Sequence, residues 1–245
     1  MRIALVSAPV KNKNVRFNLQ AMLDALAAVR NAAELVVFGE SVLQGFDCLS
    51  WNYEEDKAVA VSMNDEPILK MRQAAKEYAV AVSFGFIERV EGLLYSSQIF
   101  IGANGEIQNL FHRVSVGWKD YTKTDDHYRE GQQFETFFYS GKSFSVGLCG
   151  DLWTEGRAEE MKTLAPDVVL WPVWCDYPPE QWNRQVKFEY MQQASLCGKN
   201  VLFVNPYCAD ASPDDVASGG AAWFQDGTIL KENPAGKSGI LIVEI

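Results

Sequence analysis

The sequence has no long hydrophobic run and no concentration of positive charge. No apolar segment approaches the roughly 20 residues that cross a bilayer, and the opening MRIALVSAPV is interrupted too early for a signal peptide. The formal net charge of −10 comes without a basic patch, which disfavours binding to the phosphates of nucleic acids. We therefore expect a cytoplasmic protein with neither a membrane nor a nucleic acid among its partners.

Signatures of metal sites and disulfide frameworks are missing as well. The chain has only two histidines, His112 and His127, and no CxxC pair. Its cysteines are odd in number and widely spaced, which argues against a disulfide framework and a structural zinc site and favours free thiols in a reducing compartment. We expect no metal site, and each of the five thiols has to be judged by its surroundings: Cys48, Cys149, Cys175, Cys197 and Cys208.

Strand-like and helix-like segments alternate along a chain that is long and apolar enough for one large core. With 245 residues, of which 48% are hydrophobic, a single domain over 1–245 is expected. Helical spacing of apolar residues predicts helices over 15–33, 65–78, 157–165 and 179–197. Short apolar runs predict strands over 2–10, 34–40, 80–88, 143–151, 167–174 and 200–207. The alternation is typical of a layered α/β protein.

Turn signals predict hairpins in the middle and at the end of the chain. Asn104-Gly105 and Asp226-Gly227 each lie between apolar runs and supply the positive-φ residues of a tight turn. A polar stretch over 116–133 interrupts the pattern, and SGILIVEI at 238–245 forms the last predicted strand.

Three predicted strands are followed by a side chain that could carry out chemistry. Glu40 follows LVVFG, Arg113 follows LFH, and Cys149 follows SVGL. Polar groups directly after buried strands are costly unless they are paired or open to a cleft, and strand ends are where α/β proteins gather ligand-binding groups. A thiolate can attack a carbonyl or nitrile carbon, a carboxylate can remove the thiol proton, and a cation can support the developing negative charge.

Three segments in this order resemble the signature segments of the nitrilase superfamily of carbon–nitrogen hydrolases. They are LVVFGESVLQGFD, IFIGANGEIQNLFHRVS and VGLCGDLWTEG, and the likeness extends over nearly the whole chain through VVLWPVWCD and SGGAAWFQDGTIL. The resemblance implies an α-β-β-α sandwich of one domain that dimerises to αββα-αββα. It also implies a homodimer or higher homo-oligomer, for which ILIVEI is a candidate contact.

The resemblance further implies roles for individual residues. Glu40 corresponds to the general base and Cys149 to the nucleophile of a Glu-Lys-Cys set, and the backbone N–H of Gly150 could help to bind the oxyanion. Asp151 corresponds to the aspartate after the cysteine and is expected to hold the turn. A tetrahedral intermediate would lose ammonia or an amine, and water would hydrolyse the resulting thioester. No cofactor is needed, because acid, base and nucleophile are all side chains.

The second segment departs from the family pattern at the catalytic cation. Where the family has lysine, the sequence FHR over 111–113 ends in Arg113, which keeps the charge but differs from an ammonium in shape and cannot easily act as an acid. Lys119, six residues further on, is an alternative source of the cation if the loop folds back. Both assignments stay open at the level of sequence, with Arg113 preferred.

Further residues are expected to contact the substrate. Many family members carry a second acid in the loop before the cysteine; here Asp125 or Asp126 lies nearer the expected place than Glu130. Trp174 either forms a wall of the pocket or packs in the core, and Cys175 is expected to border the pocket.

Taken together, the sequence predicts an amidase-type enzyme that hydrolyses a small carboxamide or N-carbamoyl compound through a cysteine thioester. Nitrile hydrolysis and acyl transfer to an amine by the same thioester are alternatives. Because the lysine is replaced, a binding or regulatory protein that keeps the fold but has lost the chemistry is a further alternative.

Overall fold

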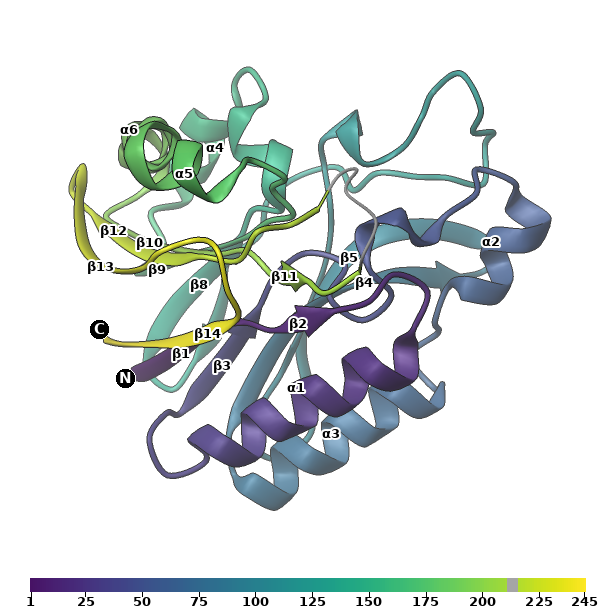
Figure 1. Ribbon diagram of the computed structural model, residues 1–245, viewed down its shortest axis with the longest axis horizontal. Helices are drawn as coiled ribbons and strands as arrows, with labels where there is room; N and C mark the ends of the chain where they lie inside the picture. Colours follow the sequence, from purple (N-terminus) through teal and green to yellow (C-terminus); the bar gives the residue numbers. More distant parts are fainter. Residues whose placement is uncertain (211–215) are drawn as a thin grey trace.

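The structure, a computed structural model, describes residues 1–210 and 216–245 and has two β-sheets at its centre (Figure 1). The first sheet has the order β14-β1-β3-β4-β5-β6 and the second β13-β12-β10-β9-β8-β7. Helices α1 and α3 cover the outer face of the first sheet, and α4 and α6 cover that of the second (Figure 1). The predicted α-β-β-α sandwich in one α/β domain is therefore confirmed.

Each sheet combines parallel strands at its centre with antiparallel strands at its edges. In the first sheet β1, β3 and β4 run parallel, and in the second β8, β9 and β10 do. The strands of the first sheet are β1 Arg2–Ser7, β3 Leu35–Phe38, β4 Ala81–Val90, β5 Leu93–Ile101, β6 Ile107–His112 and β14 Gly239–Glu244. Those of the second are β7 Phe137–Tyr139, β8 Lys142–Val146, β9 Val168–Pro172, β10 Asn200–Val204, β12 Ala221–Gln225 and β13 Thr228–Asn233. A small third pair consists of β2 Pro9–Val10 and β11 Tyr207–Cys208.

The central strands are apolar on both faces because both faces are covered. In β1, Ile3 and Leu5 pack in the core between the sheets, whereas Ala4 and Val6 pack in the core beneath α1 and α3. Successive side chains of a strand point to opposite faces, so a strand buried on both sides reads as a continuous apolar run.

The helices largely follow the predicted spans. They are α1 Val15–Val29, α2 Tyr53–Val59, α3 Glu66–Tyr78, α4 Arg157–Leu164, α5 Pro179–Gln181 and α6 Lys187–Cys197. The first predicted helix ends at Val29, before the predicted residue 33, and α2 was not predicted. The predicted helix over 179–197 is interrupted by a π-helical turn at Trp182–Val186, whose two buried side chains, Trp182 and Val186, face the core.

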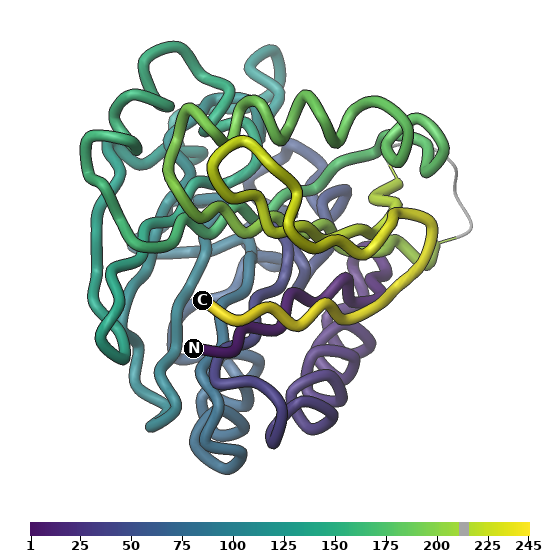
Figure 2. Tube along the Cα trace, turned by 90° about the vertical axis from the view of Figure 1, so that its left-hand side faces the viewer, coloured from purple at the N-terminus to yellow at the C-terminus, as the bar shows by residue number. Residues whose placement is uncertain are grey.

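Both predicted hairpins are present, and the last strand lies beside the first. β5 pairs with β6 and β12 with β13, with Gly105 and Gly227 at positive φ in the turns. β14 pairs with β1 along its whole length, so that the two chain ends lie side by side in both views (Figures 1 and 2). No helix among residues 1–210 and 216–245 is long and apolar enough to cross a membrane.

Candidate active site

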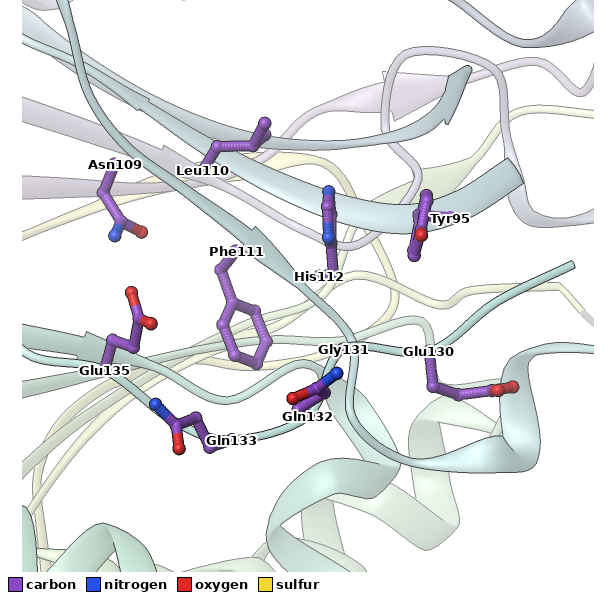
Figure 3. A pocket seen from close by; sticks show the side chains of 10 residues that line it. All are labelled: Tyr95, Asn109, Leu110, Phe111, His112, Glu130, Gly131, Gln132, Gln133 and Glu135. Atoms are coloured by element: carbon purple, nitrogen blue, oxygen red, sulfur yellow. The ribbon is translucent and has the colours of Figure 1, made fainter. Parts of the chain in front are cut away.

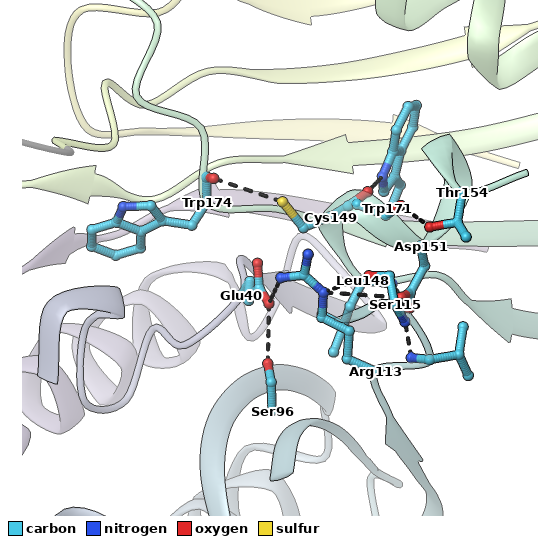
Figure 4. A network of polar contacts seen from close by, with 12 residues as sticks. Glu40, Ser96, Arg113, Ser115, Leu148, Cys149, Asp151, Thr154, Trp171 and Trp174 are labelled. Atoms are coloured by element: carbon cyan, nitrogen blue, oxygen red, sulfur yellow. Dashed lines mark hydrogen bonds and ion pairs between the residues drawn. The ribbon is translucent and has the colours of Figure 1, made fainter. Parts of the chain in front are cut away.

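The structure brings the three predicted residues to one place between the two sheets (Figure 4). Glu40 follows β3 and Arg113 follows β6 in the first sheet, and Cys149 follows β8 in the second. Arg113 Nη1 lies 2.8 Å from Glu40 Oε1, and the two side chains are 4% and 0% exposed. A Cβ on Gly150 would lie 2.7 Å from Arg113 Nη2, so the turn that carries Cys149 rests directly on the guanidinium.

Contacts from both sheets hold Glu40, one through its carboxylate and one through its backbone. The Ser96 hydroxyl on β5 donates a hydrogen bond to Glu40 Oε1 at 3.0 Å, and the backbone N–H of Glu40 donates to Val173 O at 3.2 Å, beyond the end of β9. Within the described part of the chain, the buried Oε2 atom has no hydrogen-bond partner. Ser41, the next residue, has φ of 48°, a left-handed conformation that is costly for a residue with a side chain. Glu40 therefore has one fixed oxygen and one free to take part in chemistry.

Arg113 is the cation that pairs with Glu40. Its Nη1 donates to Glu40, its Nε donates to Ser115 Oγ at 2.8 Å, and its Nε lies 3.9 Å from Asp151 Oδ1. Burial alone would lower the pKa of Arg113, but the negative charges of Glu40, Cys149 and Asp151 outweigh it and raise the pKa. The guanidinium is thus a permanent positive charge at any working pH.

The alternative cation, Lys119, is engaged elsewhere. Its Nζ pairs with Glu130 Oε1 at 2.8 Å and donates a hydrogen bond to Tyr128 O at 2.6 Å. The structure therefore brings Arg113, and not Lys119, against the carboxylate of Glu40.

Cys149 lies on a strained turn at the start of a short 3-10 helix, Cys149–Trp153. Its φ of 45° is in the left-handed region, which residues with a side chain adopt at a cost, often at functional sites. Its carbonyl accepts a hydrogen bond from Trp171 Nε1 at 2.9 Å, and its half-buried Sγ lies 3.7 Å from Trp174 O. The surrounding structure thus maintains a turn that presents the thiol between the sheets.

Asp151 connects the cysteine turn to the segment that carries Arg113. Its carboxylate accepts backbone hydrogen bonds from Val114 at 3.1 Å, Ser115 at 2.7 Å and Leu148 at 2.9 Å. Burial raises the pKa of Asp151 to about 6, although Arg113 and the hydrogen bonds of Ser115 and Leu148 act in the opposite direction. At neutral pH the group is an anion that accepts from three amides, which is the arrangement expected of a structural tie.

The raised pKa of Asp151 predicts a pH-dependent stability. Because its value of about 6 in the folded protein exceeds the ordinary value near 3.9, the folded state holds the proton more tightly between these two values. The contribution of Asp151 to the free energy of unfolding is about 2–3 kcal/mol. It is fully present below about pH 4 and is lost as the pH rises through about 6. Urea unfolding at several pH values measures how the free energy of unfolding changes with pH. Asp151→Asn should lack the fall between about pH 4 and 6, whereas Asp126→Asn, which changes an exposed acid, should keep it. An equal slope in Asp151→Asn and the wild type would contradict the assignment.

The structure places the remaining predicted residues around the trio or away from it. Trp174 is buried and stacks on Phe46 with a ring separation of 6.0 Å, while its carbonyl faces the Cys149 thiol. Asp125 is exposed and lies 2.9 Å from His127 Nδ1, and Asp126 is exposed as well, so neither lies against the ion pair. As substrate-binding residues these two acids stay a prediction.

A separate hollow of about 350 Å³ lies along the edge strand β6 and the segment 130–135 (Figure 3). His112 lines it, stacked on Tyr95 at 4.1 Å and paired with Glu88 Oε2 at 2.8 Å. His112 lines this hollow, while the next residue, Arg113, pairs with Glu40. None of the trio lines the hollow, which therefore lies outside the candidate site.

Sequence reasoning missed the residues that hold the trio in place. Ser96 and Ser115 hold Glu40 and Arg113, and Trp171 holds the cysteine turn. A signal existed for Ser96, because a polar residue in the apolar run LLYSSQIFI has to find a hydrogen-bond partner when buried. Among residues 1–210 and 216–245, no three side chains of the His, Cys, Asp or Glu type are arranged to hold a metal ion.

A buried carboxylate, a cation and a thiol from two packed sheets form the arrangement that the three sequence segments suggested. The family model described as carbon-nitrogen hydrolase matches residues 2–245. The chain belongs to the carbon–nitrogen hydrolase family. The match covers both sheets and all three candidate residues.

Relatives of this carbon–nitrogen hydrolase include amidases and nitrilases. An (R)-stereoselective amidase from Pseudomonas sp. is 25% identical over 170 residues, which are 69% of this chain and 59% of the relative. An arylacetonitrilase from Hypocrea virens is 34% identical over 120 residues, which are 44% of this chain and 35% of the relative. The matched segments thus span less than two thirds of the length of either relative.

Solved structures share the fold at low sequence identity. An amidase from Nesterenkonia sp. is 16% identical and matches with a TM-score of 0.75, covering 100% of this chain and 90% of its own. A glutamine-dependent NAD+ synthetase from Acinetobacter baumannii is 22% identical with a TM-score of 0.74, covering 98% of this chain and 44% of its own. At these identities the likeness establishes the nitrilase-superfamily fold alone.

Proposed function

We propose that this carbon–nitrogen hydrolase cleaves a small carboxamide or N-carbamoyl compound through a thioester on Cys149. The observation that carries the proposal is the buried ion pair of Glu40 and Arg113, which lies against the turn of Cys149 and leaves Glu40 Oε2 without a partner. A buried carboxylate with one unbonded oxygen beside a thiol is suited to remove the thiol proton.

The reaction would proceed in two halves. Glu40 accepts the proton of Cys149, the sulfur attacks the carbonyl carbon, and the oxyanion is stabilised by Arg113 Nη2 and the backbone N–H of Gly150. Glu40 then passes the proton to the leaving nitrogen, and ammonia or an amine departs as the thioester forms. Water, deprotonated by Glu40, attacks the thioester and releases the carboxylic acid and the thiol. The net change is the addition of one water across the carbon–nitrogen bond.

Arginine at the position of the family's lysine assigns all proton transfer to Glu40. Arg113 cannot give up a proton at any working pH, since its pKa is raised further by the charges around it. It can therefore stabilise the oxyanion but cannot protonate the leaving group. Glu40 keeps contact with Arg113 through Oε1 and remains free to exchange a proton through Oε2.

The relatives support the amide substrate and raise one competing substrate. One relative is an (R)-stereoselective amidase, and a variant of the Nesterenkonia amidase carries the acetamide moiety of fluoroacetamide at its active-site cysteine. Similarity to an arylacetonitrilase favours nitriles as the second candidate. Thiol attack on a nitrile carbon gives a thioimidate, which becomes the same thioester when water is added and ammonia is lost.

A substrate panel with two readouts tests the proposal. Primary amides, N-carbamoyl compounds and nitriles are incubated with the protein, and released ammonia is measured together with the mass of the peptide that contains Cys149. We expect ammonia from at least one amide and an acyl group on Cys149; product analysis with an added amine separates hydrolysis from acyl transfer. Loss of ammonia release in Cys149→Ala would support the mechanism. Ammonia release with the acyl group on a residue other than Cys149 would contradict it.

Iodoacetamide separates an enzyme from a protein that has lost the chemistry. An activated thiolate in Cys149 should react many times faster than glutathione at the same pH. A rate equal to that of glutathione, together with no turnover, would favour the binding or regulatory alternative.

The proposed working form is a cytoplasmic homodimer or higher homo-oligomer of one hydrolase domain, residues 1–245. β14 is the edge strand of the first sheet, and its Ile240 is exposed, which supports a role for this strand in contact between copies. All five cysteines are free thiols, as a reducing compartment would allow. Sedimentation of the protein at micromolar concentration is expected to give at least a dimer, and a monomer would contradict the proposal.

A further inference from the structure

A second thiol, Cys175, lies next to the candidate nucleophile. Cys175 directly follows Trp174, whose carbonyl oxygen lies 3.7 Å from Cys149 Sγ. Asn205 fixes its backbone on both sides, since Oδ1 accepts from Cys175 N and Nδ2 donates to Cys175 O, each at 2.9 Å. Cys175 is 5% exposed, whereas Cys149 is only half-buried. A reagent that enters the site would therefore meet Cys149 first.

The side chain of Cys175 lies between Cys149 and a tyrosine. Its Sγ is 2.9 Å from the hydroxyl of Tyr190, whose ring stacks on Trp171 at 5.0 Å. Trp171 in turn donates a hydrogen bond to the carbonyl of Cys149. The stacked pair therefore holds both cysteines: Tyr190 contacts the side chain of Cys175, and Trp171 contacts the backbone of Cys149.

The hydrogen bond with Cys149 and burial keep Cys175 protonated. The pKa of Cys175 is raised by its hydrogen bond with Cys149 and by burial, while the hydrogen bond from Tyr190 lowers it. The pKa of Tyr190 is raised by burial and by the two thiols, so its phenol stays a hydrogen-bond donor. A buried, protonated thiol beside a more exposed cysteine of proposed nucleophilic role is the arrangement of a nucleophile with a resolving cysteine.

We propose that Cys175 is a resolving thiol that converts Cys149, once oxidised by a peroxide, into a reversible Cys149–Cys175 disulfide. The proposal rests on the nucleophilic role of Cys149 proposed above. The Cys149 thiolate attacks the peroxide oxygen, the O–O bond breaks, and a sulfenic acid and one water result. Cys175 sulfur then attacks the sulfenic sulfur, the S–O bond breaks, and the disulfide forms with loss of a second water. Two electrons pass from the two thiols to the peroxide, and an external dithiol restores both thiols.

The other three cysteines are not placed for this reaction. Cys48 is buried in a separate apolar cluster with Trp118 and Tyr128. Cys208 lies on β11, and its Sγ is 3.9 Å from Asn12 Nδ2. Cys197 ends α6, where burial raises the pKa of its thiol to about 12 and its Sγ donates to Gln193 O. Neither the peroxide nor Cys149 is expected to react with these thiols.

Mass spectrometry of the peroxide-treated full chain tests the proposal. The reduced protein is treated with hydrogen peroxide and digested without reductant. We expect a cross-linked peptide pair that contains Cys149 and Cys175, a mass loss of about 2 Da, and near-complete recovery of free Cys149 after dithiothreitol. In Cys175→Ser we expect Cys149 to pass on to sulfinic acid, a gain of about 32 Da, with recovery of free Cys149 at least about tenfold lower. Cys197→Ser, a matched change at a remote thiol, should behave as the wild type.

The outcomes separate this proposal from the proposed hydrolase function. Equal recovery of free Cys149 in the wild type and Cys175→Ser, with no cross-linked peptide, would overturn the resolving role. A cross-link in a protein without turnover would support the thiol pair and count against the hydrolase. Tyr190→Phe provides a second variant if Cys175→Ser does not fold; loss of its hydrogen bond should slow disulfide formation, and an unchanged rate would count against the pair.

Discussion

Replacing Cys149 with alanine is expected to abolish hydrolysis of every amide that the wild-type protein cleaves, a loss on the order of 10⁴-fold or more in kcat. The reason is that Cys149 lies on the turn that rests on Arg113, whereas the neighbouring Cys175 is buried with its Sγ 2.9 Å from the Tyr190 hydroxyl. Stability should change little, because the half-buried side chain makes only weak polar contacts, to Trp174 O at 3.7 Å and to the Cys175 thiol. Ammonia release and urea unfolding, measured on the same preparations, check both expectations.

Cys197→Ala is the matched control for this variant. Cys197 is fully buried on the inner face of α6, so its loss removes apolar contacts while the ion pair is untouched. It should lower the free energy of unfolding and leave kcat near the wild-type value, the reverse of Cys149→Ala. Turnover that survives in Cys149→Ala would contradict the thioester mechanism, whatever the stability of the variant.

The fold could be predicted where the local pattern and the tertiary structure agree. ELVVFGE and NVLFVNPY are short apolar runs between polar residues, and each became a central strand covered on both faces. The turns at 104–105 and 226–227 needed only their own residues to adopt positive φ. In these segments the local residues alone are enough to predict the structure.

The sequence did not predict two features that depend on distant packing. The helix over 179–197 has the predicted bounds, but its turn at Trp182–Val186 is π-helical rather than α-helical, and Trp182 stacks there on Phe203 of β10 with a ring separation of 4.7 Å. α2, over Tyr53–Val59, has too few residues for an amphipathic pattern, and its buried Asp56 is held by the distant Tyr128 hydroxyl at 2.7 Å. No local spacing of apolar residues encodes such contacts.

The same distinction applies to the candidate site. Glu40, Arg113 and Cys149 could be singled out because each follows a recognisable strand in a recognisable segment. The sequence favoured Arg113 but left Lys119 open, because the choice depends on where the 116–133 segment turns, and there Lys119 pairs with Glu130. The parts of a site that come from loops depend on contacts that only the folded chain defines.

The second large effect is expected when the buried cation is removed. Arg113→Met should lower the free energy of unfolding by about 3–5 kcal/mol, the range measured when one partner of a buried ion pair is deleted. The variant would leave two buried carboxylates, Glu40 and Asp151, without their cation, and would remove the donor to Ser115 Oγ. Hydrolysis should be lost with it, because the oxyanion would have no positive charge nearby.

Two further variants show whether the effect comes from the charge, from the shape of the guanidinium, or from neither. Arg113→Lys keeps one positive charge but cannot contact Glu40, Ser115 and the Gly150 turn together, so we expect part of the stability and a small part of the activity to remain. Arg157→Met removes the half-exposed ion pair with Glu160 and should cost less than about 1 kcal/mol. Urea unfolding of the three variants at neutral pH ranks them. If Arg113→Met were as stable as Arg157→Met, the guanidinium would not be balancing the charge of the buried carboxylates. The proposal that Arg113 is a fixed cation while Glu40 transfers the proton would then lose its physical basis.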